Sequence, residues 1–143
     1  MIDFKIGTNT KKTLQRLANK CEKLSREYTK LRDPICQCAD DNCQRTTGLD
    51  WAHGISQRCE QFRYHPVNTM RLYHECHLKI DHSSNKKQLM DELMFKRLSD
   101  SQWREWAFIL VDSFFPFKPT VEWYEKQIAE LTRLISEVQH VEY

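Results

Sequence analysis

The feature that most constrains this chain is a crowding of cysteine and histidine between residues 36 and 82. The segment holds five of the six cysteines and five of the six histidines of the 143-residue chain. Clustered thiol and imidazole groups are typical zinc ligands, whereas disulfides are typical of secreted proteins. The N-terminal sequence MIDFKIGTNTKK lacks the apolar core and cleavage site of a signal peptide, so we expect metal ligands in a cytoplasmic protein.

A zinc site is the first expectation from this crowding. Three cysteines fall in the short loop 36–43, with the turn-forming sequence Asp-Asp-Asn between the last two. Cys76 would add a ligand from a second segment, and either His74 or Cys36 would complete a set of four. Tyr73 stands where a regular paired motif would have a cysteine, so reduced cysteines without metal are the alternative. The zinc candidates are Cys36, Cys38, Cys43, His74 and Cys76.

The polar residues around this loop suit phosphodiester hydrolysis. Residues 49–57 are predicted to form a strand, 58–68 a loop, and a helix is predicted to begin near Tyr73. A neutral histidine is the best general base near pH 7, and a divalent metal can neutralise charge on a phosphate. We therefore expect His53 as the base, Asp50 and His77 as ligands of a catalytic metal, and Asn68 as a brace of the loop. The alternative for His53 is a structural core histidine.

The first 32 residues are strongly basic, with nine Lys/Arg against three Asp/Glu. Residues 1–9 are expected to be irregular, and a helix capped by Thr10 is predicted to run to about Arg32. Its apolar stripe is Leu14, Leu17, Cys21, Leu24, Tyr28 and Leu31. The other faces carry the predicted DNA contacts Lys12, Arg16, Lys20 and Lys23. The alternative is a solvated helix face without a ligand.

The last third of the sequence predicts three more helices. The first covers residues 86–98, and the next follows a capping box at 99–102 and would bury an aromatic stripe. That stripe is Trp103, Trp106, Ala107, Leu110, Val111 and Phe114. The last helix begins near Thr120 and carries a heptad stripe of Val121, Tyr124, Ile128, Leu131, Ile135 and Val138. Residues 121–143 hold five acidic against two basic residues, so this helix should pair with the basic one, within one chain or across a dimer.

Three runs of sequence resemble known nuclease families. The run Asn68-x3-Leu72-x3-Cys76-His77 resembles the second half of HNH endonucleases. The runs Ala-His-Gly-Ile-Ser at 52–56 and Phe-Arg-Tyr-His-Pro-Val-Asn at 62–68 are similar to the NinG/Rap family of phage recombination nucleases. The resemblance covers about residues 10–100. The chain departs from the family at Ala52, where many HNH proteins have a metal ligand, and at Tyr73, which replaces a zinc cysteine.

The resemblance implies a metal-dependent DNA endonuclease that acts on branched recombination intermediates such as Holliday junctions or D-loops. It implies that His53 is the general base, that His77 is a metal ligand, and that Asn68 braces the loop. Arg63 would lie beside the phosphate, and Arg58 is a further candidate for DNA contact. The implied cofactors are a structural Zn²⁺ and a catalytic Mg²⁺ or Mn²⁺. The implied setting is the cytoplasm of a bacterial or phage-infected cell.

The predicted fold class is α+β, with a small zinc-supported ββα-metal core between long N- and C-terminal helices. We divide the chain into a basic helix at 1–34, an HNH and zinc core at 35–85, and a helical region at 86–143. The expected partners are branched DNA and a second copy bound through the helical arms, without a membrane. Two alternatives stay open: a zinc-supported DNA-binding module without nuclease activity, and a helical protein-interaction module.

Overall fold

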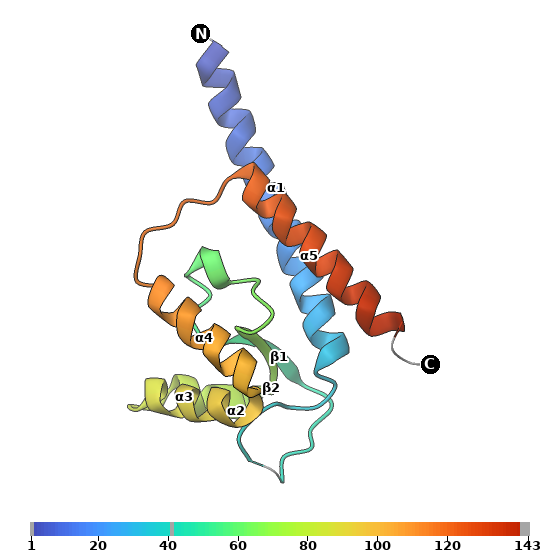
Figure 1. The fold of residues 1–143 in the computed structure, drawn as a ribbon, viewed down its shortest axis with the longest axis vertical. Coiled ribbons are helices and arrows are strands. Elements are labelled where there is room, and N and C mark those ends of the chain that lie inside the picture. The colour runs from blue at the N-terminus through green and yellow to red at the C-terminus, as the bar shows by residue number, and fades with distance from the viewer. Residues whose placement is uncertain (1, 41, 141–143) are drawn as a thin grey trace.

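The computed structural model describes residues 2–40 and 42–140. Its helices and strands are drawn in Figure 1. In chain order they are α1 (Ile2–Arg32), β1 (Leu49–His53), the 3₁₀ turn η1 (Glu60–Phe62), β2 (Thr69–Tyr73), α2 (His74–Asp81), α3 (Lys86–Arg97), α4 (Asp100–Asp112) and α5 (Val121–His140). The predicted mixture of helices with a small sheet, flanked by long terminal helices, is therefore confirmed. No helix in the described ranges is both long and apolar enough to cross a membrane.

The sheet at the centre is a single antiparallel pair, β1 with β2. Its register places Asp50 opposite Leu72, Ala52 opposite Met70, and His53 opposite Thr69. Because side chains alternate along a strand, the even-numbered residues point to one face and the odd-numbered residues to the other. A two-stranded sheet is marginal by itself, so both faces need cover from helices.

The even-numbered face packs on α2, α3 and α4. Ala52, Met70 and Leu72 are almost completely buried there. Their neighbours in this core are the apolar residues of the three helices, chiefly Ile80, Met90, Leu93, Met94, Trp106 and Ile109. The predicted capping box starts α4, since the Ser99 side chain accepts from the Gln102 amide and the Gln102 side chain accepts from the Ser99 amide. This core holds α2 against the even-numbered face of the hairpin.

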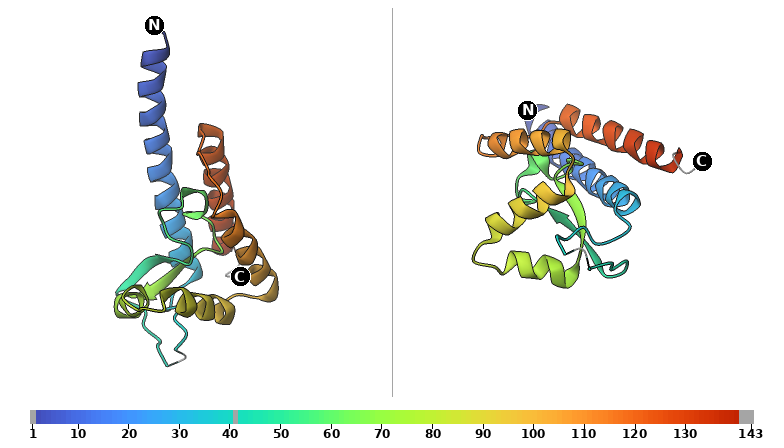
Figure 2. Two further views of the ribbon diagram at one scale, coloured as in Figure 1. Left: turned by 90° about the vertical axis from the view of Figure 1, so that its left-hand side faces the viewer. Right: turned by 60° about the horizontal axis from the view of Figure 1, so that its bottom comes forward.

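The odd-numbered face of the hairpin lies against α1, which in turn packs on α5. Figures 1 and 2 show the two long helices crossing side by side, both running in the same direction. Leu17, Cys21 and Tyr28 of α1 form a second core with Tyr124, Leu131 and Ile135 of α5. The predicted pairing of the two apolar stripes therefore occurs within one chain. Tyr64, from the loop between the strands, and Trp51 of β1 also contact this core.

A charged junction joins the end of α1 to the hairpin. The Arg32 guanidinium donates to both Asp33 carboxylate oxygens at 2.9 Å, and also to the carbonyls of Pro66 and Thr69 at 2.6 Å. Asp33 is 4% exposed, and Arg97 of α3 approaches its carboxylate to 3.6 Å. Removal of one partner of a buried ion pair leaves an uncompensated charge, so this junction strongly restricts how α1 meets β2 and α3.

Two boundaries differ from the sequence-based prediction. Residues 2–9, expected to be irregular, belong to α1, because no proline interrupts the helix there. The first strand ends at His53 instead of extending to residue 57. Beyond Gly54 the ladder is replaced by side-chain bonds, since Asn68 Oδ1 accepts from the Ile55 amide and Asn68 Nδ2 donates to the Ile55 carbonyl.

The prediction for the apolar stripe of α4 is partly wrong. Trp106 and Ile109 are buried, but Ala107 is exposed and Val111 and Phe114 are 60% and 79% exposed. The reason is that the core contacts only one side of α4, whereas apolar residues occupy both sides of this helix.

The seam between α1 and α5 should contribute a large share of the stability. Leu131 is 2% exposed in this seam, so Leu131→Ala should lower the free energy of unfolding by about 3 kcal/mol through loss of buried surface and a residual cavity. The measurement is chemical denaturation followed by circular dichroism. Thr132→Ala, at the exposed neighbouring position, is the control. Equal stability of the two variants would contradict a seam formed within the chain.

Candidate functional site

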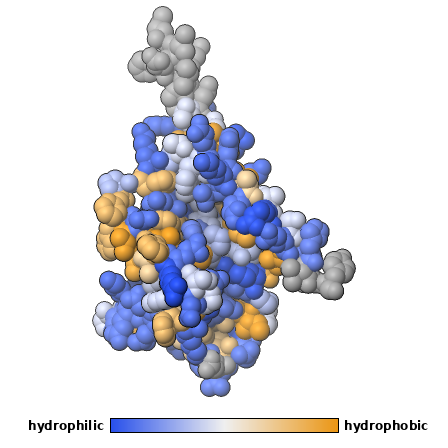
Figure 3. Space-filling model, in the orientation of Figure 1, coloured by the Kyte–Doolittle hydropathy of each residue, from blue (hydrophilic) through white to orange (hydrophobic). Residues whose placement is uncertain are grey.

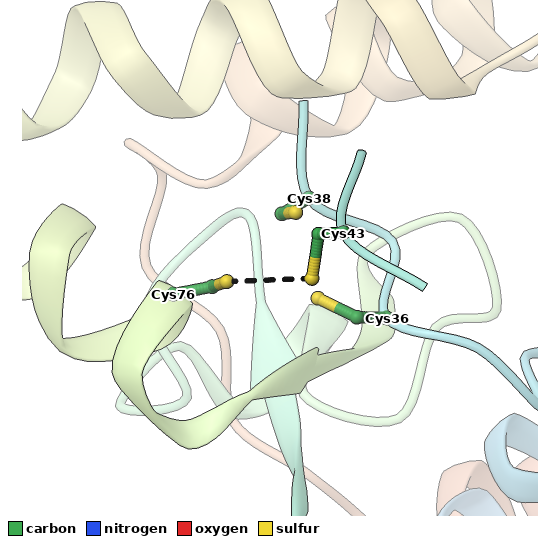
Figure 4. Close-up of side chains that lie close together, drawn as sticks. All are labelled: Cys36, Cys38, Cys43 and Cys76. Carbon is green, nitrogen blue, oxygen red and sulfur yellow. Dashed lines mark hydrogen bonds between the residues drawn. The ribbon is translucent and has the colours of Figure 1, made fainter. Parts of the chain in front are cut away.

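Four cysteines converge beside the hairpin. Cys36, Cys38 and Cys43 come from the loop between α1 and β1, and Cys76 comes from the first turn of α2. Figure 4 shows their side chains pointing toward one another. Their sulfur atoms all lie within 4.8 Å of one another, and the Sγ atoms of Cys43 and Cys76 are 3.9 Å apart. None of the four forms a disulfide.

This geometry fits a tetrahedral zinc ion. With Zn–S bonds of about 2.3 Å, the sulfur atoms of a tetrahedral site lie about 3.8 Å apart. The Cys43–Cys76 separation of 3.9 Å matches that spacing, and the other sulfur atoms lie no more than 4.8 Å apart. The cluster can therefore hold one structural zinc, with Cys36 rather than His74 as the fourth ligand. Such a metal would join the loop before β1 to α2 across the end of the sheet.

The surroundings of the cysteines shift their pKa values in opposite directions. The Tyr73 amide donates to Cys36 Sγ at 3.1 Å, and a hydrogen bond from the Arg45 backbone lowers the pKa of Cys43. Burial is the main cause that raises the pKa of Cys38 to about 11, and burial also raises the pKa of Cys76. Burial thus keeps the thiols of Cys38 and Cys76 protonated, and a zinc ion would displace these protons when it binds.

His74 belongs to a second polar cluster, on the even-numbered face of β1. Asp50 Oδ2 lies 2.8 Å from His74 Nδ1 and 3.1 Å from His77 Nδ1. His77 Nε2 in turn lies 3.2 Å from an oxygen of Asp81, one turn later in α2. Asp50 reaches both histidines because the strand register places it opposite Leu72, close to the start of α2.

The contacts of Asp50 with His74 and His77 are of hydrogen-bond length. Among residues 2–40 and 42–140, the group of three or more side chains close enough to hold one metal ion is the four cysteines. Partial burial opposes ionisation of Asp50, but hydrogen bonds from His74 and His77 lower its pKa overall. A carboxylate with imidazole neighbours at the protein surface is a typical donor set for a catalytic metal.

His53 lies on the other face of β1, largely enclosed. Its Nε2 lies 2.9 Å from the carbonyl oxygen of Arg63, so Nε2 carries the proton and Nδ1 keeps the lone pair. Burial is the main cause that lowers the pKa of His53 to about 4, with contributions from the positive charges of Arg63, Arg26 and His77. The ring is thus neutral at physiological pH and held in one orientation, also by edge contact with Trp51 at 4.4 Å between ring centres.

Asn68 holds the loop that positions His53. Its side chain is fully buried and bonds to the amide and carbonyl of Ile55 and to the carbonyl of Phe62. Gly54, directly after His53, lies so close to the core that a Cβ atom there would be 2.2 Å from Cε of Met94. Any larger residue at 54 would therefore displace the loop or the core.

The hairpin separates the two groups of polar residues. Asp50 and His53 are three residues apart and point to opposite faces, toward α2 and α1 respectively. A ligand at position 52 would share the face of Asp50, but Ala52 is 1% exposed and packed in the core. Asp50 is the polar residue on this face, and it lies about 7 Å before Ala52 along the strand.

The predicted basic contacts form a stripe along α1. Lys12, Arg16, Lys20 and Lys23 are all exposed at spacings of three and four residues. Arg26 continues the stripe and lies 4.5 Å above the ring of Trp51, next to His53. Of the two arginines predicted to contact DNA outside α1, Arg58 is exposed, whereas Arg63 is held by Glu22 at 2.6 Å and approaches Glu60 at 3.9 Å.

Sequence reasoning missed two residues and one contact in these clusters. Arg26 was not among the predicted DNA contacts, and only the packing of Trp51 against α1 reveals its position. Glu22 was not singled out because its partner Arg63 is 41 residues away. The link from His74 to Asp50 depends on strand register, and a connection of 15 residues between the strands gives no local turn signal for that register.

Comparison of the chain with family models, with curated proteins and with solved structures finds no match.

We expect one zinc ion per chain. Cys43→Ser should remove the zinc measured by elemental analysis and lower the thermal midpoint, because a structural metal contributes directly to folding. Cys21→Ser and Cys59→Ser are matched controls, since both cysteines lie outside the cluster, and they should keep the full zinc content. Natively purified protein with less than a tenth of an equivalent of zinc would contradict the assignment.

Proposed function

We propose that the protein is an HNH-type, metal-dependent DNA endonuclease. The observation that carries the proposal is the hairpin followed directly by α2. A neutral, oriented His53 lies at the end of β1, and Asp50 on the opposite face of the same strand contacts His77 of α2. The proposal also rests on the resemblance of residues 52–77 to HNH and NinG/Rap nucleases.

The His53 imidazole acts as the general base in the proposed reaction. Its Nδ1 accepts a proton from a water molecule, whose oxygen attacks the phosphorus atom. The bond from phosphorus to the 3′-oxygen breaks, and the leaving oxygen takes a proton from solvent. The Arg63 carbonyl fixes the tautomer of His53, and the imidazolium formed in the step is stabilised by the same hydrogen bond.

Asp50 and His77 are the proposed holders of the catalytic metal, with His74 as an additional ligand. When bound there, Mg²⁺ or Mn²⁺ would offset negative charge on the phosphate and on the leaving oxygen. Asp81 orients the His77 ring through Nε2, which leaves Nδ1 directed at Asp50. The zinc-supported loop holds the start of α2, and therefore His77, in place.

The α1 stripe is the proposed DNA contact. From Lys12 to Arg26 it spans about 21 Å, which matches about six phosphates of one strand. Contacts of this kind bind the backbone and carry little sequence information. The stripe ends beside His53, so a strand bound along it would deliver a phosphate to the candidate base. We propose branched DNA as the substrate, because nothing in this set of residues resembles a base-reading helix.

One observation favours a second function, a zinc-supported DNA-binding module without cleavage. His53 is largely buried and its Nε2 is already bonded within the protein, which is also how a structural histidine is held. The basic stripe and the cysteine cluster would serve such a module equally well. The two functions differ in what happens to DNA when His53 is replaced.

His53→Gln should reduce cleavage of a four-way junction about 100- to 10,000-fold, the effect typical of losing a general base. The glutamine amide can still donate to the Arg63 carbonyl, so folding and junction affinity should persist. The measurement is single-turnover cleavage with Mn²⁺ or Mg²⁺. His140→Gln, an exposed histidine at the end of α5, is the control. Cleavage by His53→Gln at the wild-type rate would refute His53 as the base, and no cleavage by any form would favour the binding module.

Replacement of Lys12, Arg16, Lys20 and Lys23 together by alanine should abolish tight DNA binding while zinc content stays at one per chain. Removal of phosphate contacts should also flatten the dependence of affinity on salt. The measurement is competition between a four-way junction and a linear duplex of the same sequence at several salt concentrations. Lys118→Ala/Lys126→Ala, which removes exposed charges outside α1, serves as the comparison. Equal wild-type affinity for both DNAs would rule out selection by shape.

A further inference from the structure

An apolar surface lies on the solvent side of α4 and on the first residues after it. Its members are Phe108 and Val111 of α4, and Phe114 and Phe115, which are 60–79% exposed. Figure 3 shows hydrophobic residues gathered in this region, at the left edge of the molecule. We call this set the α4 apolar surface. Contiguous exposed aromatic residues of this kind mark a site of association, because single exposed apolar residues are normal but clusters are not.

The α4 apolar surface is separate from the core. Trp106 and Ile109 lie on the opposite side of α4 and face the hairpin core. Phe108 and Val111 share the outward side, at helical spacing, with Arg104 one turn before Phe108 and Asp112 one turn after it. Both charged residues are exposed, and neither has an ion-pair partner among residues 2–40 and 42–140.

We propose that the α4 apolar surface binds a second copy of this chain, with the two α4 helices antiparallel and crossing at Phe108. A twofold axis at Phe108 places Phe108 against its own copy, and the two neighbouring Val111 side chains extend the apolar contact. The same symmetry places Arg104 four residues to one side of the axis and Asp112 four residues to the other. Each Arg104 therefore faces the Asp112 of the other copy, and two complementary ion pairs flank the apolar centre.

The charges of α4 disfavour nucleic acid or an anionic membrane as the occupant. The helix carries three acidic residues, Asp100, Glu105 and Asp112, against one basic residue, Arg104. A surface that stacks DNA bases or inserts into anionic lipid is instead surrounded by Lys and Arg. The seam between α1 and α5 is already filled within one chain. The second copy expected on the helical arms is therefore placed on α4, a surface that the sequence-based prediction treated as core.

The dimer would give the proposed nuclease two candidate sites related by twofold symmetry. That use rests on the proposed function, but the association itself does not. A four-way junction has approximate twofold symmetry, so a dimer could engage two of its strands at once.

The test is the mass of the full-length protein in solution, measured by light scattering after size exclusion at 5–200 µM, a range of roughly 40-fold chosen to bracket ordinary dimer affinities. Wild type should have twice the chain mass of 17.2 kDa. Phe108→Glu should raise the dimer dissociation constant at least about 30-fold, because a central aromatic contact is replaced by two like charges. Its thermal midpoint at low protein concentration should be unchanged, since Phe108 is 75% exposed.

A charge exchange tests the arrangement itself. Arg104→Asp and Asp112→Arg should each weaken the dimer, and the double variant Arg104→Asp/Asp112→Arg should restore it, because every cross-axis pair is again of opposite charge. Leu31→Glu, an exposed apolar position on α1, is the matched control and should stay dimeric. A monomeric wild type, an unaffected Phe108→Glu, or failure of the double variant to recover would each overturn the proposal. None of these results depends on nuclease activity, and loss of cleavage alone would leave the dimer standing.

Discussion

The buried carboxylate of Asp33 is the contact on which the arrangement of the two cores depends. It sits where α1 ends and is contacted by Arg32 of α1 and Arg97 of α3, while Arg71 of β2 donates to the backbone carbonyl of Asp33. Arg32 also donates to two carbonyls of the hairpin, so one guanidinium bonds both to its neighbour in sequence and to residues more than 30 positions later. Burial lowers the pKa of Arg97 to about 10, whereas the bonds to Asp33 outweigh burial and raise that of Arg32. The Asp33 carboxylate thus offsets the repulsion between the nearby positive charges of Arg32 and Arg97. The same contacts hold α1 across the odd-numbered face of the hairpin.

The two faces of the hairpin carry different polar side chains. The α2 face carries the carboxylate and imidazole donors, and the α1 face carries His53 together with the arginines. Two sets of contacts hold the segments next to these faces in position. The sulfur cluster ties α2 to the loop before β1, and Asn68 ties the loop after β1 to itself. Each support is remote from the proposed reacting atoms, so damage to either would alter the site through position rather than through chemistry.

Much of the fold followed from local signals in the sequence. The apolar stripes predicted the end of α1 and the course of α5, and the Ser99 capping box predicted the start of α4, because each signal has a local physical cause. The cysteine set was also predictable, because short spacing brings Cys36, Cys38 and Cys43 together whatever the rest of the chain does.

Other features depend on contacts that no local pattern encodes. The contact between His74 and Asp50 depends on the register of β1 and β2. The long connection between the two strands gives no local signal that would predict this register. The exposure of Phe108 and Phe114 was not predictable, since a helix with apolar residues on both sides does not reveal which side faces the core. Arg63 could be identified as a charge near the site, but its pairing with Glu22 follows only from the packing of α1 on the loop.

The parallel packing of α1 on α5 has a consequence for how the chain acquires its structure. Cys21 contacts the backbone of Tyr124, 103 residues later, whereas the sulfur cluster spans only the interval from Cys36 to Cys76. During synthesis the hairpin and its cysteines therefore leave the ribosome complete while α1 still lacks its partner. The apolar stripe of α1 stays open to solvent until α5 emerges, so a helix made before the hairpin is covered only after it. The basic residues on its other faces then keep an unpaired helix soluble during that interval.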